Sequence, residues 1–191
     1  HPVVTPLAVD QGHPFPRLPS GTLCFAVLLR RYRTVSFAVV PVPGVISRVL
    51  RLPSARDEHQ FILLDEVLRA GLPAFFRGYR IVEAALFRVI RDGELFVEEE
   101  YADDLLEAIA AEVKKRPVGL PVSVEVERGA SRALVSRLAA EIGIESDAAA
   151  RVEREVDLTF LFDLIGRTGR RTLLYPDFTP AHRPYADVFD R

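Results

Sequence analysis

Residues 22–40, TLCFAVLLRRYRTVSFAVV, carry the clearest secondary-structure pattern of the sequence. Its two halves, Thr22–Leu29 and Thr34–Val40, are rich in Val, Leu and Phe, and the polar segment Arg30–Arg33 separates them. Two apolar runs of strand length around a short polar segment predict a β-hairpin. The segment Pro41–Gly44 should end the second strand, because proline cannot continue a strand ladder.

Upstream of the hairpin, prolines recur between residues 1 and 20 and alternate with apolar residues such as Leu7 and Phe15. Proline fixes the backbone φ angle and lacks an N–H donor, so a regular helix or a central strand is disfavoured here. We therefore expect residues 1–20 to form an extended N-terminal segment that is laid against another part of the protein.

Downstream, a brief strand over Gln60–Leu64 should pass directly into a helix near Asp65–Phe76, where leucine and phenylalanine recur at helical spacing. Gly78 follows as a terminator. Residues Tyr79–Ile90 form the longest strand candidate and are apolar on both faces, which is typical of a strand in the centre of its sheet. The short segment Val45–Leu52 predicts a turn of helix followed by a strand.

The second half of the chain alternates further strands and helices. Acidic residues lead into an apolar helical stripe that ends with basic residues, so a helix is predicted over Glu98–Arg116. Alternating valines predict a half-exposed strand over 122–127. Ser131 should cap the next helix, and Gly143 should end it.

The last elements are short. Arg151–Glu155 is a strand candidate, and Asp157 could cap a final helix over Leu158–Ile165 that Gly166 and Gly169 terminate. The tail, Arg170–Arg191, shows no steady period and contains further prolines.

These elements predict an α+β fold, a two-layer sandwich with a mainly antiparallel sheet and helices packed on one face. The expectation of a single covered face rests on Glu125 and Glu127, which share one side of their strand and so predict water on that side. We divide the chain into the N-terminal segment 1–20, a domain over 21–169, and an irregular linker over 170–191.

Composition excludes several classes of protein. The chain is 49% hydrophobic and 27% charged, as in an ordinary globular domain, and its net charge of −2 argues against a dedicated nucleic-acid binder. No apolar run approaches the ~20 residues of a membrane span. A lone cysteine, Cys24, cannot form an internal disulfide, so we expect a reducing, cytoplasmic location. The absence of methionine, with His1 at the start, predicts an excised segment or a processed product of a longer protein.

Motifs for chemistry are scarce. No phosphate-binding glycine motif is present, and the nearest stretch, Gly166–Arg171, is interpreted as a solvated turn. The histidines at 1, 13, 59 and 182 are scattered and Cys24 stands alone, so we predict no metal site. The acids Glu98–Glu100 are explained by their place at a helix start. Cys24 lies in an apolar strand, where a buried thiol is inert.

Several motifs nevertheless resemble one family. They are Phe75-Phe76-Arg77-Gly78-Tyr79, Leu86-Phe87-Arg88-Val89-Ile90-Arg91-Asp92, Val97-Glu98-Glu99-Glu100 with Ala102-Asp103-Asp104-Leu105-Leu106, Val3–Asp10 with His13-Pro14-Phe15-Pro16, and Pro176-Asp177-Phe178-Thr179-Pro180. In this order they resemble the middle (head) domain of the long, phosphohistidine-type bacterial polyphosphate kinases. The chain departs from the family pattern at Ile90, which replaces Thr, at Gly93, which replaces Ala, and over Leu18–Gly21, where an Asn-containing stretch is lost.

The resemblance implies a parent enzyme that reversibly transfers the terminal phosphate of ATP to polyphosphate, with Mg²⁺, through a phosphohistidine. In that family the catalytic histidine lies beyond this domain, and His13 belongs to a different motif. We therefore assign no catalytic, cofactor-binding or metal residue here. The expected role is a non-catalytic one, in which the domain supports dimerisation and braces the flanking N-terminal and catalytic domains of the same chain.

Two alternatives stay open. The chain could be a free-standing interaction or oligomerisation module without kinase activity, which the flanking gene sequence would decide. A weak polyphosphate contact is the other, through arginines of the hairpin turn (Arg30, Arg31, Arg33) or arginines after the last helix (Arg167, Arg170, Arg171). The near-neutral net charge favours a domain that holds the enzyme together over one that grips its product.

Overall fold

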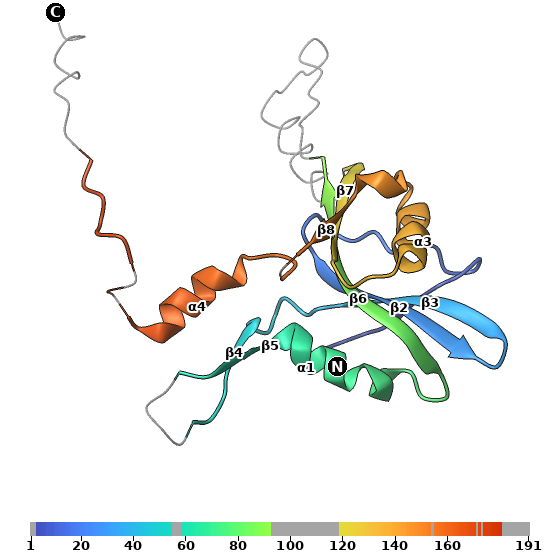
Figure 1. Ribbon diagram of the computed structural model, residues 1–191, viewed down its shortest axis with the longest axis horizontal. Coiled ribbons are helices and arrows are strands. Elements are labelled where there is room, and N and C mark those ends of the chain that lie inside the picture. The colour runs from blue at the N-terminus through green and yellow to red at the C-terminus, as the bar shows by residue number, and fades with distance from the viewer. Residues whose placement is uncertain are drawn as a thin grey trace, which may run out of the picture.

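The computed structural model describes residues 3–54, 59–92, 119–153, 155–170, 172 and 174–180 (Figure 1). The elements in chain order are β1 (Leu7–Val9), β2 (Leu23–Arg31), β3 (Thr34–Pro41), β4 (Val49–Arg51), β5 (Phe61–Leu63), α1 (Leu64–Phe75), β6 (Arg80–Arg91), β7 (Pro121–Glu127), α3 (Arg132–Ile142), the 3₁₀ turn Ser146–Ala148, β8 (Ala149–Val152) and α4 (Phe160–Thr168). The predicted helix Glu98–Arg116 falls outside the described residues.

The main sheet has six strands in the order β1-β3-β2-β6-β7-β8, and all neighbours are antiparallel except β7 and β8, which are parallel. The predicted hairpin is confirmed as β2–β3. Its strands run further than expected, because Arg31 pairs with Thr34 and leaves only Tyr32 and Arg33 in the turn. The predicted central strand is confirmed as β6, which lies between β2 and β7.

Residues of β2 alternate between two hydrophobic cores, one on each face of the sheet. Cys24 and Ala26 belong to the core that α3 covers with Leu134 and Leu138. Leu23, Phe25, Val27 and Leu29 belong to the core that α1 covers with Leu64, Leu68 and Leu72. The α+β class and the mainly antiparallel sheet are confirmed. The placement of the helices needs correction, because α1 and α3 lie on opposite faces (Figure 1).

The wrong prediction that both helices pack on one face of the sheet arose from the acidic residues of β7. Glu125 and Glu127 were expected to face water, but Glu125 receives a two-point contact from Arg88 at 2.7 and 3.2 Å. Arg69, on α1, contacts both carboxylate oxygens of Glu127. Arginine neutralises a carboxylate best through such paired hydrogen bonds, so an acidic strand face can pack beneath a helix.

The N-terminal segment is laid against the sheet, as expected. Strand β1 pairs with β3, Leu18 is buried in the α3-side core, and the Phe15 ring lies 6.4 Å from that of Phe87. On the same side, the hydroxyl of Ser131 accepts a hydrogen bond from the backbone N–H of Leu134 and caps α3 as predicted. Gly143 ends this helix in the left-handed conformation that glycine adopts readily.

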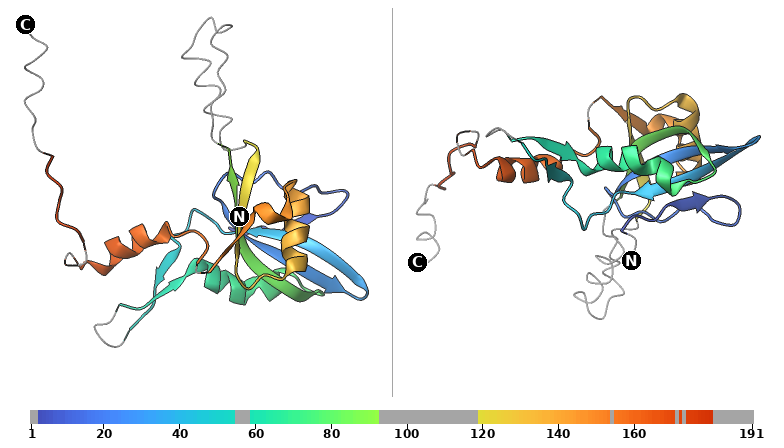
Figure 2. Two further views of the ribbon diagram at one scale, coloured as in Figure 1. Left: turned by 45° about the horizontal axis from the view of Figure 1, so that its top comes forward. Right: turned by 90° about the horizontal axis from the view of Figure 1, so that it is seen from below.

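Two elements project from the body of the sheet. The β4–β5 pair and α4 extend together to one side, as two further views show (Figure 2). No described residue of α4 is buried, in contrast to the several core residues of α1 and α3. None of the described helices is long and apolar enough to cross a membrane.

Candidate functional site

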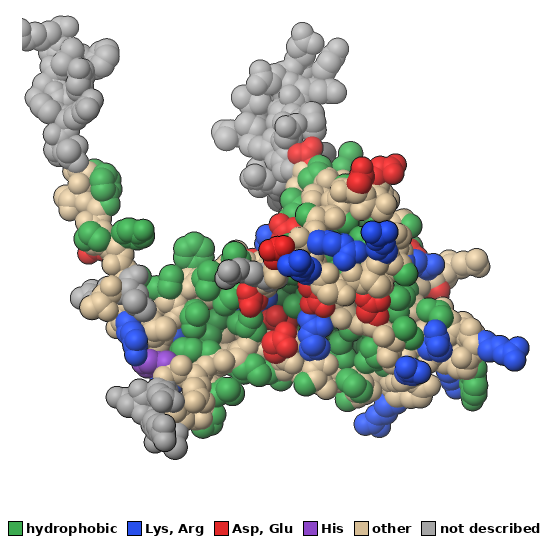
Figure 3. All heavy atoms as spheres, in the orientation of Figure 1, with side chains coloured by type: hydrophobic (Ala, Val, Ile, Leu, Met, Phe, Trp, Pro, Cys, Tyr) green, Lys and Arg blue, Asp and Glu red, His purple; other side chains and the backbone are tan. Residues whose placement is uncertain are grey.

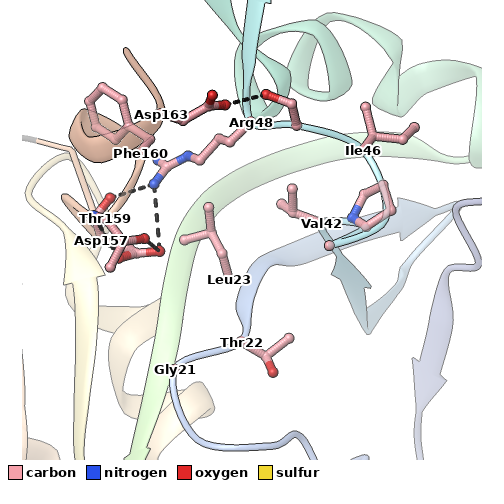
Figure 4. A pocket seen from close by; sticks show the side chains of 13 residues that line it. Gly21, Thr22, Leu23, Val42, Ile46, Arg48, Asp157, Thr159, Phe160 and Asp163 are labelled. Atoms are coloured by element: carbon pink, nitrogen blue, oxygen red, sulfur yellow. Dashed lines mark hydrogen bonds and ion pairs between the residues drawn. The ribbon is translucent and has the colours of Figure 1, made fainter. Parts of the chain in front are cut away.

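A hollow of about 490 Å³ lies where α4 meets the body of the protein, at the end of the sheet opposite the β2–β3 turn (Figure 4). It lies between the start of β2, the segment after β3, and the start of α4. Its lining residues are Gly21, Thr22, Leu23, Val42, Pro43, Gly44, Ile46, Ser47, Arg48, Asp157, Thr159, Phe160 and Asp163.

Arg48 is the central side chain of this hollow. Its Nε and Nη2 donate to the two carboxylate oxygens of Asp65 at 2.7 and 3.2 Å, and its Nη1 donates to the backbone carbonyl of Asp157. The side chains of Arg48 and Asp65 are only 12% and 2% exposed. An ion pair this well buried is stable only when its hydrogen bonds are formed, so the relative positions of Arg48, Asp65 and Asp157 are narrowly defined. We call these three residues the Arg48 joint.

Asp157 links two arginines from different segments, Arg88 on β6 and Arg48 just before β4. One carboxylate oxygen lies 3.0 Å from Nη1 of Arg88 and the other lies 3.8 Å from Nη1 of Arg48. Asp157 also adopts a positive φ of 63°, which is uncommon outside glycine. Its predicted capping role needs correction: α4 begins at Phe160, and the carboxylate accepts from the N–H and hydroxyl of Thr159 instead.

The first turn of α4 is held to the same place by two further contacts. The guanidinium carbon of Arg48 lies 5.0 Å from the centre of the Phe160 ring, within cation–π range. The hydroxyl of Ser47 donates to Asp163, which also accepts from Arg167 at 2.6 Å. These hydrogen bonds, that from Arg167 first, hold the pKa of the Asp163 carboxyl below its ordinary value.

The other residues that the sequence singled out lie apart from this hollow. His13 sits in an exposed turn, where its Nδ1 lies 3.0 Å from Asp10. That hydrogen bond is the largest of the effects that lower the pKa of Asp10. Cys24 is buried in the sheet, and burial raises the pKa of its thiol to about 12, which keeps it protonated and unreactive.

The arginines considered as polyphosphate contacts divide into two groups. Arg30, Arg31 and Arg33 are exposed at the β2–β3 turn. At the other end, Arg167 is paired with Asp163 on its own helix, Arg170 is exposed, and Arg171 lies outside the described residues. Among the described residues, therefore, the two sets lie apart.

The motifs that carried the family resemblance have structural roles where the structure describes them. Phe87 is fully buried, and Arg88 holds Glu125 and Asp157. Arg91 donates to the carbonyls of Leu18 and Gly119 at 2.7 and 2.8 Å, which ties the N-terminal segment to β6. Burial, followed by the charge of Arg17, lowers the pKa of Arg91.

The sequence analysis missed Arg48 and Asp65, although they are the best-buried ion pair described. They lie 17 residues apart, and Arg48 and Asp157 are 109 residues apart. No local spacing joins residues at such separations. The signal that existed was weak: a single arginine in the otherwise apolar run Val45–Leu50, and an aspartate at the apolar start of α1.

The ion pairs around this hollow connect elements within one α+β domain. The side chains involved contact one another and neighbouring elements; they are Arg48, Asp65, Arg88 and Asp157. Residues 1–164 match the family described as the polyphosphate kinase middle domain. The chain belongs to this family of polyphosphate kinase middle domains, in agreement with the resemblance of its motifs.

Individual relatives agree with this assignment. The chain is 36% identical over its whole length to a polyphosphate kinase of Lactiplantibacillus plantarum, and it covers 27% of that protein. It is 37% identical over 98% of its length to a polyphosphate kinase of Streptomyces coelicolor, of which it covers 25%. The crystal structure of polyphosphate kinase from Porphyromonas gingivalis has the same fold over 93% of the chain, with a TM-score of 0.68 and 20% identity. The chain thus spans about a quarter of the length of these relatives.

Proposed function

We propose that this chain is the non-catalytic middle domain of a polyphosphate kinase, in which it positions the flanking N-terminal and catalytic domains and supports a cytoplasmic homodimer. The parent enzyme would extend polyphosphate by one phosphate from ATP and release ADP. The chain covers about a quarter of its relatives, so the rest of such an enzyme offers flanking partners of ample size.

The observation that carries the proposal is the unpartnered apolar surface of the α4 arm, which we define as residues 157–170. Leu158, Leu161, Phe162 and Ile165 are all exposed there, and the Phe162 side chain is 82% exposed. Apolar side chains also gather over this arm in the space-filling view (Figure 3). Contiguous apolar surface of this kind on a folded domain marks a contact with another protein surface.

The joint at Arg48 supports the same role. Arg48, Asp157 and Ser47 fix the start of α4, while the remainder of the helix contributes no buried residue. Buried ion pairs and hydrogen bonds fix the start of this helix, while its apolar side chains are exposed to solvent. Such a helix can bind another protein surface through its apolar side. We assign the neighbour to the flanking part of the parent chain.

ATP and Mg²⁺ are assigned to the parent enzyme outside this segment. In the part of the chain that the structure describes, no three His, Cys, Asp or Glu side chains come together as metal ligands. We therefore derive no catalytic step from these residues, and we expect the 191-residue chain alone to form no polyphosphate from ATP.

The test is the variant Phe162→Glu in the longer polyphosphate kinase that contains this segment. We expect a lower melting temperature and a loss of polyphosphate synthesis, because a charge would be buried in the domain contact. Leu120→Glu is the matched control, since Leu120 is also strongly exposed, at 79%, but lies outside α4. Equal effects of both variants, or none, would contradict the α4 contact.

Dimerisation needs its own measurement. Light scattering during size-exclusion chromatography should give a dimer for the longer enzyme, and a monomer at all concentrations would contradict that part of the proposal. If the 191-residue chain proves to be encoded without kinase neighbours, the free-standing interaction module becomes the better description.

A further inference from the structure

A group of exposed arginines surrounds the β2–β3 turn, at the end of the sheet far from α4. Arg30 and Arg31 end β2, Arg33 lies in the turn, Arg80 begins β6, and Arg77 lies just before it. Strands β2 and β6 are antiparallel neighbours, so the end of one and the start of the other meet. The space-filling view shows basic side chains gathered here (Figure 3). We call this group the arginine tip.

The tip differs from the partly buried arginines of the domain in that its charges are unbalanced. Arg69, Arg88 and Arg48 are each paired with carboxylates. Arg91 and Arg151 donate to backbone carbonyls. Within the described residues, by contrast, no carboxylate lies within ion-pairing distance of an arginine of the tip.

Two of these arginines face each other directly. Arg30 and Arg80 are register partners across β2 and β6, so their side chains leave the same face of the sheet side by side. Like charges placed opposite each other on neighbouring strands destabilise the pairing. An anion between the two guanidinium groups would remove this repulsion, and each could donate paired hydrogen bonds to phosphate oxygens.

A third arginine is oriented by aromatic rings. The guanidinium carbon of Arg31 lies 5.9 Å from the ring centre of Tyr32 and 5.5 Å from that of Tyr79. A guanidinium that stacks on rings keeps its edge N–H groups free to bind phosphate. The tip thus combines fixed strand positions with free donors.

The net charge of −2 does not oppose anion binding at this place. Charges more than a Debye length away, about 8 Å at physiological ionic strength, are largely screened. The carboxylates of the Arg48 joint lie at the other end of β2 and β6, near Leu23 and Arg88. Two described carboxylates lie closer to the tip, but Glu83 accepts from Ser131 and Asp10 contacts His13, and neither pairs with an arginine of the tip.

We propose that the arginine tip is a binding site for inorganic polyphosphate. A linear polyanion with closely spaced charges can contact Arg30 and Arg80 on one face and continue around the turn to Arg31 and Arg33. The identification of the polyanion rests on the proposed function, while the presence of an anion site rests on the unbalanced arginines alone. The contact would bind the polymer and contribute no chemistry.

The experiment measures the binding of long-chain inorganic polyphosphate to the 191-residue chain by isothermal titration at low salt. We compare wild type with Arg30→Gln/Arg31→Gln/Arg80→Gln. The charge-matched control is Arg17→Gln/Arg51→Gln/Arg132→Gln, which removes exposed arginines away from the tip. We expect the tip variant to bind at least about tenfold more weakly, with a shallower salt dependence, because fewer phosphates are neutralised. The control variant should change the Kd less than about twofold.

Several outcomes would overturn the proposal: no binding by wild type at low salt, equal losses in the tip and control variants, or tighter binding of an oligo-dT of matched charge. A tip variant that binds polyphosphate normally but changes oligomeric state would assign the arginines to a protein contact instead. Circular dichroism and the urea midpoint establish that each variant is folded. The titration involves neither α4 nor ATP, so a negative result leaves the Phe162 test unaffected.

Discussion

The arginines near one end of β2 and β6 form largely buried ion pairs, whereas those at the other end are exposed and form no ion pair with a described residue. At the α4 end, Arg48 and Arg88 are largely buried and meet the carboxylates of Asp65, Asp157 and Glu125. At the turn end, Arg30 and Arg80 are exposed and face each other without an acidic partner among the described residues. The same side chain thus joins elements at one end and leaves free charge at the other. The role of an arginine in this domain therefore depends on the carboxylates near it in the fold and not on how many arginines the sequence contains.

The largest expected effect comes from breaking the Arg48 joint. Arg48→Met leaves Asp65 buried without its partner, and removing one member of a buried pair costs about 3–5 kcal/mol. Urea unfolding of the 191-residue chain would measure this loss. The double variant Arg48→Met/Asp65→Leu should recover most of it, because no uncompensated charge is left. A loss below about 1 kcal/mol for the single variant would show that the joint is solvated and remove its contrast with the tip.

The joint also shows how much of the protein could be predicted from the sequence. The hairpin, the central strand β6 and the Ser131 cap were predicted correctly, because each rests on local periodicity or a local hydrogen bond. The face on which α1 packs was not. Glu125 and Glu127 indicate water when considered by themselves, and only the tertiary partners Arg88 and Arg69 reverse that reading.

The arginine tip was easier to predict from the sequence than the Arg48 joint, because most of its residues are neighbours in the chain. Arg30, Arg31 and Arg33 are neighbours in the sequence, so their proximity was visible at once. The addition of Arg80 required the register of β2 against β6. The joint required three segments, around residues 48, 65 and 157, to meet through tertiary contacts that no periodicity encodes. The motifs resembling the family were sufficient for the domain assignment but did not indicate this joint.

A smaller effect is expected at Arg88, which lies at the same end but is less buried. Arg88→Met removes a two-point contact with Glu125 and a contact with Asp157. The hydrogen bonds that Arg88 donates to Glu125, and the negative charges of Glu125 and Asp157, raise the pKa of Arg88. Its partners keep some access to water, so we expect a loss of about 1–2 kcal/mol in urea unfolding. Arg88→Lys should recover part of the charge interaction but not the two-point geometry. A loss equal to that of Arg48→Met would contradict the ranking by burial.

The smallest effect, and the one opposite in sign, is expected at the arginine tip. Arg30→Gln/Arg80→Gln removes two like charges that face each other across β2 and β6, so in the absence of polyphosphate the free energy of unfolding should rise by a few tenths of a kcal/mol. This gain should be largest at low salt and disappear in ~1 M NaCl, where the Debye length is about 3 Å. Urea unfolding at both salt concentrations measures it, with Arg51→Gln/Arg132→Gln as the control for a general change in charge. With polyphosphate added, wild type and the control variant should gain stability and the tip variant should not, because a ligand that binds the folded state alone shifts unfolding by mass action. A stability loss in the tip variant without ligand would mean that these arginines are structural, as Arg48 and Arg88 are, and the two ends of the sheet would no longer differ.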